Sequence, residues 1–509
     1  MGTVKVIAGL SVILYILWSL PFDEEKPVTI RYPIGVRTKI PELDTSAIRF
    51  HQHYVLLMQL LSPLVTVDQT GNIVAGLAEK FYWKNGSLHL VLRDNVKSAT
   101  GKTFGPEDVV LTFKRLMILS RNTHGDLADF LCPDNRPRSL DDDCKGMTTS
   151  GREVILTPVR YAPFLTELLT SIDFGILHRS QIDSDDLSIL NFSDTSGPYF
   201  FSADDDPEKP GVLNINPDHW EYSTDAPQRV DLVRYDDADD VFQMFRKGKL
   251  DFIPSGVSFD RVAFQRFYEA NRESASLRRT RNLGIMLLVF TERGEAEFSE
   301  NERFAIGHHF RKNMADYSNK RGYGSKETVQ FFAEFGEAGL EEKDLNALRE
   351  KFEKANNEPF NVGRTVHLSG YSESFADFLR KSVAQHPDIS VKANWRDYDA
   401  GKLPPDEVPH AYVFPTDTAW NESLSLIAYS MKMNQLRVNN LEERVADYLA
   451  EPDKKKRLGK LRRLHFDALK EARIVPLISE PYFSIARKPW IQQEWPLMPG
   501  ISLSTLRRN

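Results

Sequence analysis

The chain has 509 residues, of which 41% are apolar and 27% are charged, as in ordinary globular proteins. At about 100 to 200 residues per domain, it can form about two to four domains with substantial cores. The 65 basic and 72 acidic side chains give a formal net charge of −7. No nucleic acid partner is therefore expected, because binding to phosphates relies on an excess of positive charge.

An apolar run occupies residues 6–20, after Lys5, and ends at Pro21 and the acidic residues 23–25. As a helix it would cover about 22 Å, less than the roughly 30 Å core of a bilayer, which favours a signal peptide within residues 1–27. An N-terminal membrane anchor and a buried helix are the alternatives. The charges on either side of the run place the rest of the chain outside the cytoplasm. We therefore expect a periplasmic or other extracytoplasmic protein, either released or tethered to the inner membrane by this segment.

The first elements after this run build a core. Alternation over residues 28–32 predicts a strand, and apolar residues at helical spacing predict a helix over 50–61. A second strand is predicted over 88–94. A helix is expected to begin at Pro106, because proline is tolerated in the first turn and the acids at 107 and 108 suit the positive end of the helix dipole.

A strand over residues 230–235, a helix over 238–245 and a strand over 250–254 follow one another closely. This order predicts a βαβ unit and a parallel sheet.

A second unit of the same kind is expected after more than a hundred further residues. It comprises a strand over 365–368, a helix over 373–384 and a strand over 389–393. Two separate units indicate two α/β lobes, and a ligand is expected where they face each other. The remaining predicted elements are a strand over 410–414, largely helical structure over 441–472, and strands over 474–478 and 483–487.

Cys132 and Cys144 are the two cysteines of the chain. In an oxidising compartment a disulfide bond between them would close a local loop, and free thiols are the alternative. A zinc site would need more ligands than this pair supplies.

Sequences that resemble catalytic motifs are incomplete. Residues 100–103 imitate the end of a phosphate-binding loop, but Val96 stands where its first glycine is required. Residues 370–374 lack the second glycine of a nucleophile elbow. His308 and His309 are adjacent and would not share one face of a helix as metal ligands do. We expect neither enzyme activity nor a metal or cofactor.

Several blocks of sequence stand in order between about residues 28 and 490. The clearest are Leu61–Thr66 with Gly71–Glu79, Leu90–Lys97 running into Gly101–Val110, Ser196–Tyr199, and Asn216–Trp220. In this order they resemble the family 5 extracellular solute-binding proteins, which are the oligopeptide, dipeptide and nickel receptors of ABC importers.

The resemblance implies an α/β fold of the periplasmic binding protein-like class, with two hinged α/β lobes and a small extra domain. Domain I would comprise residues 28–46, 155–260 and 475–509, domain II residues 47–154, and domain III residues 261–474. A ligand would be enclosed between domains I and III when the hinge closes.

Peptide-binding members carry a Trp-x-x-Asp segment whose acid pairs with the amino terminus of the ligand. Phe414 to Asp417 match it here, with phenylalanine in place of tryptophan. The resemblance implies that Asp417 anchors an amine and that Phe414 forms an apolar wall. Trp420, Tyr482 and Phe483 are expected to line the same cleft. A turn-capping role for Asp417 and simple packing of the aromatic residues are the alternatives.

We therefore expect a monomeric binding protein that captures a peptide or similar small-molecule ligand and delivers it to an ABC permease in the inner membrane. A membrane-tethered sensor or scaffold with the same fold, outside transport, is the first alternative. A hydrolase acting on a bound peptide is the second.

Overall fold

The computed structural model of the protein describes residues 28–36, 38–48, 51–119, 127–159, 162, 164–202, 209, 211–257, 261–319, 324–333, 336–355, 362–370, 372–383, 386–399, 401–417, 438–492 and 502–508. The expected leader at residues 1–27 and the predicted site residue Trp420 lie outside this part of the chain. None of the described helices is both long enough and apolar enough to cross a membrane.

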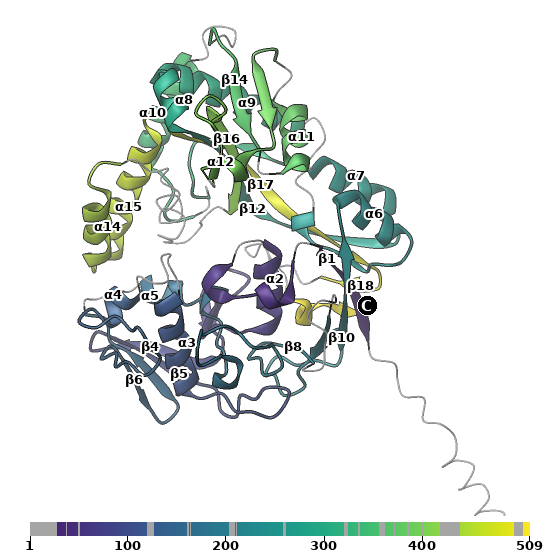
Figure 1. Ribbon diagram of the computed structural model, residues 1–509, viewed down its shortest axis with the longest axis vertical. Helices are drawn as coiled ribbons and strands as arrows, with labels where there is room; N and C mark the ends of the chain where they lie inside the picture. Colours follow the sequence, from purple (N-terminus) through teal and green to yellow (C-terminus); the bar gives the residue numbers. More distant parts are fainter. Residues whose placement is uncertain are drawn as a thin grey trace, which may run out of the picture.

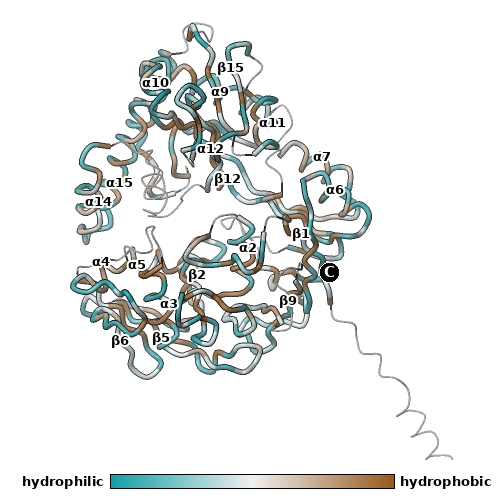
Figure 2. The backbone as a smooth tube through the Cα atoms, viewed as in Figure 1, coloured by the Kyte–Doolittle hydropathy of each residue, from teal (hydrophilic) through white to brown (hydrophobic). Residues whose placement is uncertain are grey.

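Two groups of elements lie one above the other in Figure 1 and are joined along one side. We call them the lower lobe, which is built on two four-stranded sheets, and the upper lobe, which is built on a seven-stranded sheet. Apolar stretches, brown in Figure 2, run mostly through the interior of each lobe, and hydrophilic stretches lie mostly on the outside.

The first sheet of the lower lobe is mixed. Its spatial order is β1 (Thr29–Gly35), β10 (Arg229–Tyr235), β9 (Val212–Ile215) and β8 (Tyr199–Phe201). β1 runs parallel to β10, and the other neighbours are antiparallel. Helix α2 (His51–Leu60) packs on this sheet, since Leu57 and Leu60 share one buried cluster with Ile30 and Tyr199.

The second sheet of the lower lobe is antiparallel. Its order is β4 (Ala78–Lys84), β5 (Ser87–Leu92), β7 (Glu153–Leu156) and β6 (Met147–Ser150). Helix α3 (Pro106–Leu119) begins at the proline, as expected, and buries Val109, Phe113 and Leu116 in the core of this sheet. A disulfide bond joins Cys132 to Cys144, with the Cα atoms 5.0 Å apart.

The sheet of the upper lobe contains the two longest strands described. Its order is β11 (Phe252–Ile253), β17 (Ile474–Arg487), β12 (Ala275–Phe290), β16 (Ala411–Asp417), β14 (Val366–Ser369) and β15 (Ile389–Lys392), with β13 (Lys326–Glu327) paired to β17. β12 and β17 run antiparallel along most of their length. They extend from the interior of the upper lobe toward the side where the lobes join (Figure 1).

Helices cover both faces of this sheet. Ile285 and Leu287 of β12 belong to the same buried cluster as Leu461 of α15 (Lys454–Leu469). The alternate residues Met286 and Leu288 belong to a cluster on the other face with α9 (Glu300–Asn319). Such alternation follows from the two-residue period of a strand.

Shorter elements complete the structure. The hairpin β2 (Val65–Val67) and β3 (Ile73–Ala75) and the pair β18 (Trp490–Ile491) and β19 (Arg507–Arg508) form two small sheets. The other helices are α4 (Leu127–Leu131), α5 (Phe164–Leu168), α6 (Ala238–Arg246), α7 (Arg261–Asn271), α8 (Glu292–Glu297), α10 (Glu342–Ala355), α11 (Glu373–Ser382), α12 (Trp395–Asp399) and α14 (Leu441–Ala450).

The second predicted βαβ unit is confirmed, since β14, α11 and β15 follow in order and the two strands pair in parallel. The first predicted βαβ unit is wrong, because its two strands do not pair with each other. β10, α6 and β11 form as elements, but β1 lies between the two strands. It pairs with β10 on one side, and its Arg31 carbonyl accepts a hydrogen bond from the Asp251 amide on the other. β11 pairs antiparallel with β17 instead.

Candidate functional site

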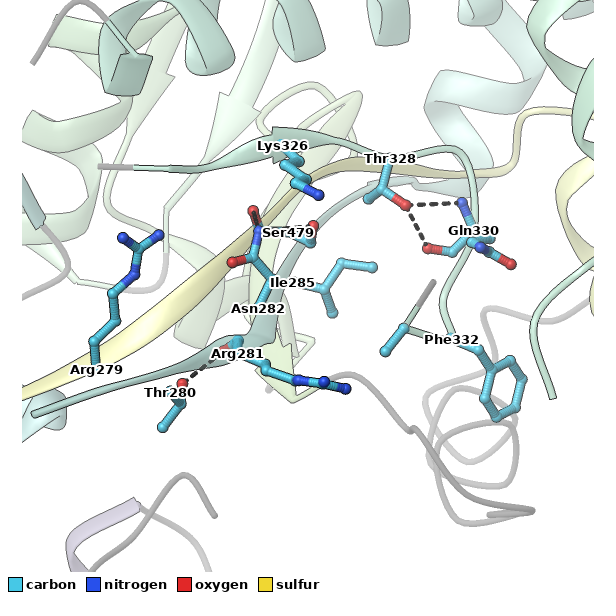
Figure 3. A pocket seen from close by; sticks show the side chains of 11 residues that line it. Arg279, Thr280, Arg281, Asn282, Ile285, Lys326, Thr328, Gln330, Phe332 and Ser479 are labelled. Carbon is cyan, nitrogen blue, oxygen red and sulfur yellow. Dashed lines mark hydrogen bonds between the residues drawn. The ribbon is translucent and has the colours of Figure 1, made fainter. Parts of the chain in front are cut away.

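A pocket of about 330 Å³ lies on the first half of β12, beside β13 and β17 (Figure 3). The segment 328–333, which follows β13, forms its far wall. The residues that line the pocket are Arg279, Thr280, Arg281, Asn282, Ile285, Lys326, Thr328, Gln330, Phe332, Ala333 and Ser479.

An irregularity in β12 shapes this pocket. The register between β12 and β17 shifts between Arg279 and Asn282, and again before Gly284. In a regular strand successive side chains face opposite sides, whereas a bulge redirects them. The shift allows all four residues from 279 to 282 to border one pocket.

Hydrogen bonds fix the irregular stretch. Thr280 Oγ1 accepts a bond of 2.9 Å from the Tyr482 amide and donates one of 2.6 Å to the carbonyl of Arg281. Asn282 Nδ2 donates to the carbonyl oxygens of Gly324, at 3.2 Å, and Ser479, at 3.1 Å. The floor of the pocket is thus tied both to β17 and to the chain before β13.

The far wall is held in place by α15. The amide of Phe331 donates a 2.9 Å hydrogen bond to Nε2 of His465, and the two rings stack with centroids 5.1 Å apart. Burial lowers the pKa of His465 to about 3, so this histidine is neutral and can accept that bond. Within the wall, Gln330 Oε1 accepts a bond of 2.8 Å from the Leu340 amide.

Three cationic side chains, Arg279, Arg281 and Lys326, border the pocket, and among the described residues that line it none is acidic. Arg279 lies over the ring of Phe483 at 5.7 Å. It also passes so close to Gly324 that a side chain there would collide with the guanidinium. The charged side chains among the described lining residues are thus all cationic, on a chain whose net charge is negative.

The structure places four of the predicted site residues near this pocket. Asp417 pairs across β16 and β12 with Gly284, the neighbour of Ile285, and Phe414 pairs with Leu287 further along. The main chain of Tyr482 is bonded to Thr280. Phe483 is 3% exposed and belongs to the apolar core beneath Arg279. Their roles toward a ligand remain predictions.

Sequence reasoning missed the basic residues of the pocket. For the two arginines the signal was the run Arg278-Arg279-Thr280-Arg281, which is separated by Asn282 from the apolar stretch Leu283–Phe290 of the same strand. Charged residues at the start of an otherwise buried strand mark a place where its side chains leave the core.

A serine–histidine contact in the lower lobe is not a catalytic pair. Ser62 Oγ lies 3.5 Å from Nε2 of His219, but Nδ1 of this histidine accepts a 3.2 Å bond from the Glu221 amide. Nε2 therefore carries the proton and cannot take one from the serine. Burial also lowers the pKa of His219 to about 3.

The segment that imitates a phosphate-binding loop has a structural role. Lys102 Nζ bonds to Asp194 Oδ2 at 2.6 Å, and the hydroxyls of Ser98, Thr100 and Ser180 donate to the same carboxylate. Burial opposes ionisation of Asp194, but these bonds outweigh it and lower the pKa to about 2. Among the described residues, no group of histidine, cysteine and acidic side chains is placed to hold a metal ion.

No family model matches the sequence. The dipeptide-binding protein of Lactococcus lactis subsp. cremoris is 24% identical to this chain over 265 residues, which are 48% of this chain and 46% of that protein. The match thus spans about half the length of this curated relative.

Solved structures match almost the whole chain. They include the murein tripeptide binding protein MppA of Escherichia coli, with a TM-score of 0.72 and 15% identity over 95% of this chain and 99% of that chain. OppA of Haemophilus influenzae, in complex with the peptide RPPGFSPFR, matches with a TM-score of 0.70 and 15% identity over 95% of this chain and 99% of that chain. NikA of Staphylococcus aureus, in complex with Ni(L-His)2, matches with a TM-score of 0.70 and 14% identity over 94% of this chain and 100% of that chain. The chain therefore has the fold of these two-lobed binding proteins, and the fold class expected from the sequence is confirmed.

Proposed function

We propose that this chain is an extracytoplasmic solute-binding protein of an ABC-type importer. It captures a peptide or a similar small solute between its two lobes and delivers it to a permease in the inner membrane. One observation carries the proposal: a pocket lined by polar and apolar residues lies on the two long strands that run toward the junction of the lobes, in a chain whose fold matches binding proteins over 95% of its length.

The mechanism is a population shift between open and closed states. A solute that touches both lobes stabilises the closed state, and the permease recognises that state. This role needs no bond of the solute to break and no cofactor. The three-domain division implied by the sequence resemblance fits this opening and closing mechanism, because it places the hinge between domains I and III.

The names of the relatives support a peptide as the solute. The Lactococcus protein is called dipeptide-binding, MppA is called a tripeptide-binding protein, and OppA was solved with a peptide of nine residues. NikA, solved with nickel and histidine, has the same fold. The presence of an aspartate at position 417, where peptide receptors place the acid that holds an amino terminus, favours the peptide over the metal complex.

Native mass spectrometry of protein purified without denaturation tests the function directly. We expect a mass above that of the polypeptide, because an enclosed solute survives purification, and we expect the excess to vanish on unfolding. Fragmentation of the released component identifies it as a peptide or another small solute. A sample that carries no solute, and that binds none of a set of defined short peptides, would contradict the proposal.

Asp417→Ala tests the proposed amine anchor. An enclosed ammonium–carboxylate hydrogen bond contributes about 1.5 to 3 kcal/mol, so we expect the dissociation constant of a peptide with a free amino terminus to rise at least about tenfold. Calorimetry with the same peptide in acetylated form is the control, since the acetylated peptide should bind wild type and variant equally. An unchanged constant for the free peptide would remove Asp417 from the site.

A further inference from the structure

We infer that the pocket on β12 is a subsite for a neutral primary carboxamide of the solute, which the amino group of Gln330 and the side-chain oxygen of Asn282 recognise. This inference rests on the proposed function and specifies the class of its solute. The carboxamide belongs either to a glutamine or asparagine side chain or to an amidated C-terminus. The two sources have the same chemistry, and the experiment below distinguishes them.

The three cations that border the pocket are already engaged within the protein. Arg279, Arg281 and Lys326 each have an interaction with another group of the chain. For Arg279 one such group is the ring of Phe483, over which its guanidinium lies. Among the described lining residues, unused hydrogen-bonding groups are therefore to be sought on the neutral side chains.

Gln330 offers one donor to the pocket, and its other polar groups are bonded within the protein. Its main-chain amide donates to Thr328 Oγ1 at 3.3 Å, and its carbonyl accepts from the same hydroxyl at 3.2 Å. Its Oε1 accepts from the Leu340 amide at 2.8 Å, which fixes the orientation of the side-chain amide. Its Nε2 has no hydrogen-bond partner among the described residues, although only 3% of the residue is exposed. A donor on so buried a residue is unfavourable unless a bound molecule accepts from it.

Asn282 offers an acceptor, and its orientation is also set by the protein. Its Nδ2 donates to the carbonyl oxygens of Gly324 and Ser479, so the oxygen of the same amide is the group left over. This Oδ1 has no hydrogen-bond partner among the described residues. The register of β12 shifts on either side of Asn282, and the residue borders the pocket there.

A donor and an acceptor on two fixed neutral groups suit a carboxamide, whose oxygen accepts and whose nitrogen donates. A carboxylate has acceptors only and would leave the oxygen of Asn282 without a donor. An ammonium has donors only and would leave the amino group of Gln330 without an acceptor. Because closure of the lobes would bury the unsatisfied group, the pocket should discriminate against both charged groups.

The subsite is next to the proposed amine anchor. Asp417 pairs with Gly284, and Asn282 precedes that glycine by two positions in β12. Gln330 belongs to the segment 328–333, which forms the far wall (Figure 3). The subsite is thus placed for a side chain near the amino terminus of a peptide, or for the C-terminus of a very short one.

Calorimetry of the full chain with tripeptides that all have a free amino terminus tests the inference. Ala-Gln-Ala is compared with Ala-Glu-Ala and Ala-Met-Ala, whose side chains have similar lengths, and Ala-Ala-Ala is compared with its C-terminal amide. The first set is repeated with the variable residue in third place. We expect the carboxamide member of at least one set to bind about tenfold or more tightly than the others. A preference in the first set identifies a side chain as the source, and one in the second identifies the C-terminus.

Gln330→Glu separates the donor of this residue from its structural role. Glutamate keeps an oxygen that accepts from the Leu340 amide but replaces the amino group by a second oxygen, so the preference should fall to about twofold or less. Gln243→Glu is the matched control, since it makes the same chemical change at an exposed position of α6 that does not line the pocket. It should leave the preference unchanged. Thermal unfolding verifies that both variants fold, and the comparison in wild type decides alone if Gln330→Glu does not.

The inference is overturned if the carboxamide, carboxylate and apolar members bind alike, if a carboxylate binds most tightly in both sets, or if folded Gln330→Glu keeps the full preference. Tripeptides that bind without a carboxamide preference leave the proposed function standing and remove only this inference. If no tripeptide binds but a solute co-purifies, a solute without a primary carboxamide likewise removes only this inference. Failure of every tripeptide at about 1 mM, together with an empty protein in native mass spectrometry, removes both.

Discussion

Gly197 shows how one residue of a sequence motif secures the fold. A Cβ at this position would overlap main-chain atoms of Leu60 and Leu61 at the end of α2. The amide of Gly197 donates to the Leu60 carbonyl at 2.9 Å, and the neighbouring Ser196 hydroxyl accepts from the Ser62 amide at 3.0 Å. The motif Ser196–Tyr199 thus joins a helix to the sheet, which explains its presence without any role toward a ligand.

Gly197→Ala should destabilise the protein by about 1 to 3 kcal/mol, because the methyl group must push the backbone of α2 away. Gly459→Ala is the matched control. Gly459 lies in α15 with no heavy atom within 4 Å of an added Cβ, so alanine there should stabilise the protein by about 0.5 to 1 kcal/mol. Urea unfolding measures both, and equal stabilities of the two variants would contradict the close packing described.

The residues of the candidate site could be predicted only in part from the sequence. Asp417 and Phe414 were predicted because they match a family pattern, and Tyr482 and Phe483 were predicted to line the same cleft. None of the four is among the residues that line the pocket. Arg281 and Lys326 could not be found in this way. They border one pocket because β12 and β13 both pair with β17, and no local pattern reveals this relation between distant segments.

At the scale of elements, the link between α15 and the pocket wall depends on His465. Its Nε2 accepts from Phe331, and within the described structure its buried Nδ1 has no hydrogen-bond partner. Protonation in place would abolish the bond to Phe331, and the deep burial of the ring opposes the charge. One titratable group, His465, therefore affects both the position of the pocket wall and the stability of the lobe.

His465→Phe should reduce the dependence of stability on pH. The pKa of this histidine falls from 6.5 to about 3 on folding, so the unfolded chain binds the proton first and stability is lost as the pH falls from about 6.5 toward 3. Phenylalanine cannot titrate, and between pH 7.5 and pH 5 its variant should lose about 2 kcal/mol less than wild type.

Urea unfolding of both proteins at these two pH values gives the comparison. Other buried histidines are common to both and cancel. At pH 7.5 the variant should itself be less stable by about 1 to 3 kcal/mol, because the Phe331 amide loses its acceptor. Equal pH dependence in the two proteins would show that His465 does not couple folding to protonation.

Most of the elements that were predicted from an apolar pattern form in the structure. No element was predicted over β12, although its second half is apolar; its first half has no apolar alternation, and it is a strand because β17 pairs with it. Residues 474–487 were predicted as two strands, since Pro481 and its polar neighbours suggest a break. The structure has one strand, in which Pro481 lies opposite the irregular stretch of β12, where a missing amide donor is tolerated.

The largest predicted helical region is divided in the structure. The prediction covered residues 441–472, but α14 ends at Ala450 and α15 begins at Lys454. Pro452 interrupts the main-chain hydrogen bonds, and Asp453 caps the new helix by accepting from the Lys456 amide at 2.8 Å. Both signals were present in the sequence.

At the scale of the whole molecule, the two-lobe architecture was predictable from the family resemblance. The second argument, from two local βαβ units, was correct only for the unit of β14, α11 and β15. The path of the chain was not predictable. β1 enters between β10 and β11, so residues separated by about two hundred positions become neighbours. No local sequence pattern predicts which distant strands will form hydrogen bonds with each other. The boundaries of the three proposed domains remain a prediction for the same reason.

β12 and β17 have two roles in the structure, since the strands that run toward the junction of the lobes also form the floor of the pocket. In the proposed function, recognition of the solute and closure of the lobes would therefore involve the same two strands. If the proposed function holds, substitutions at positions 279 to 282 that change ligand preference are expected to change the opening angle of the unliganded protein as well. Homologues that bind different ligands should then differ in the opening angle between their lobes as well as in ligand preference.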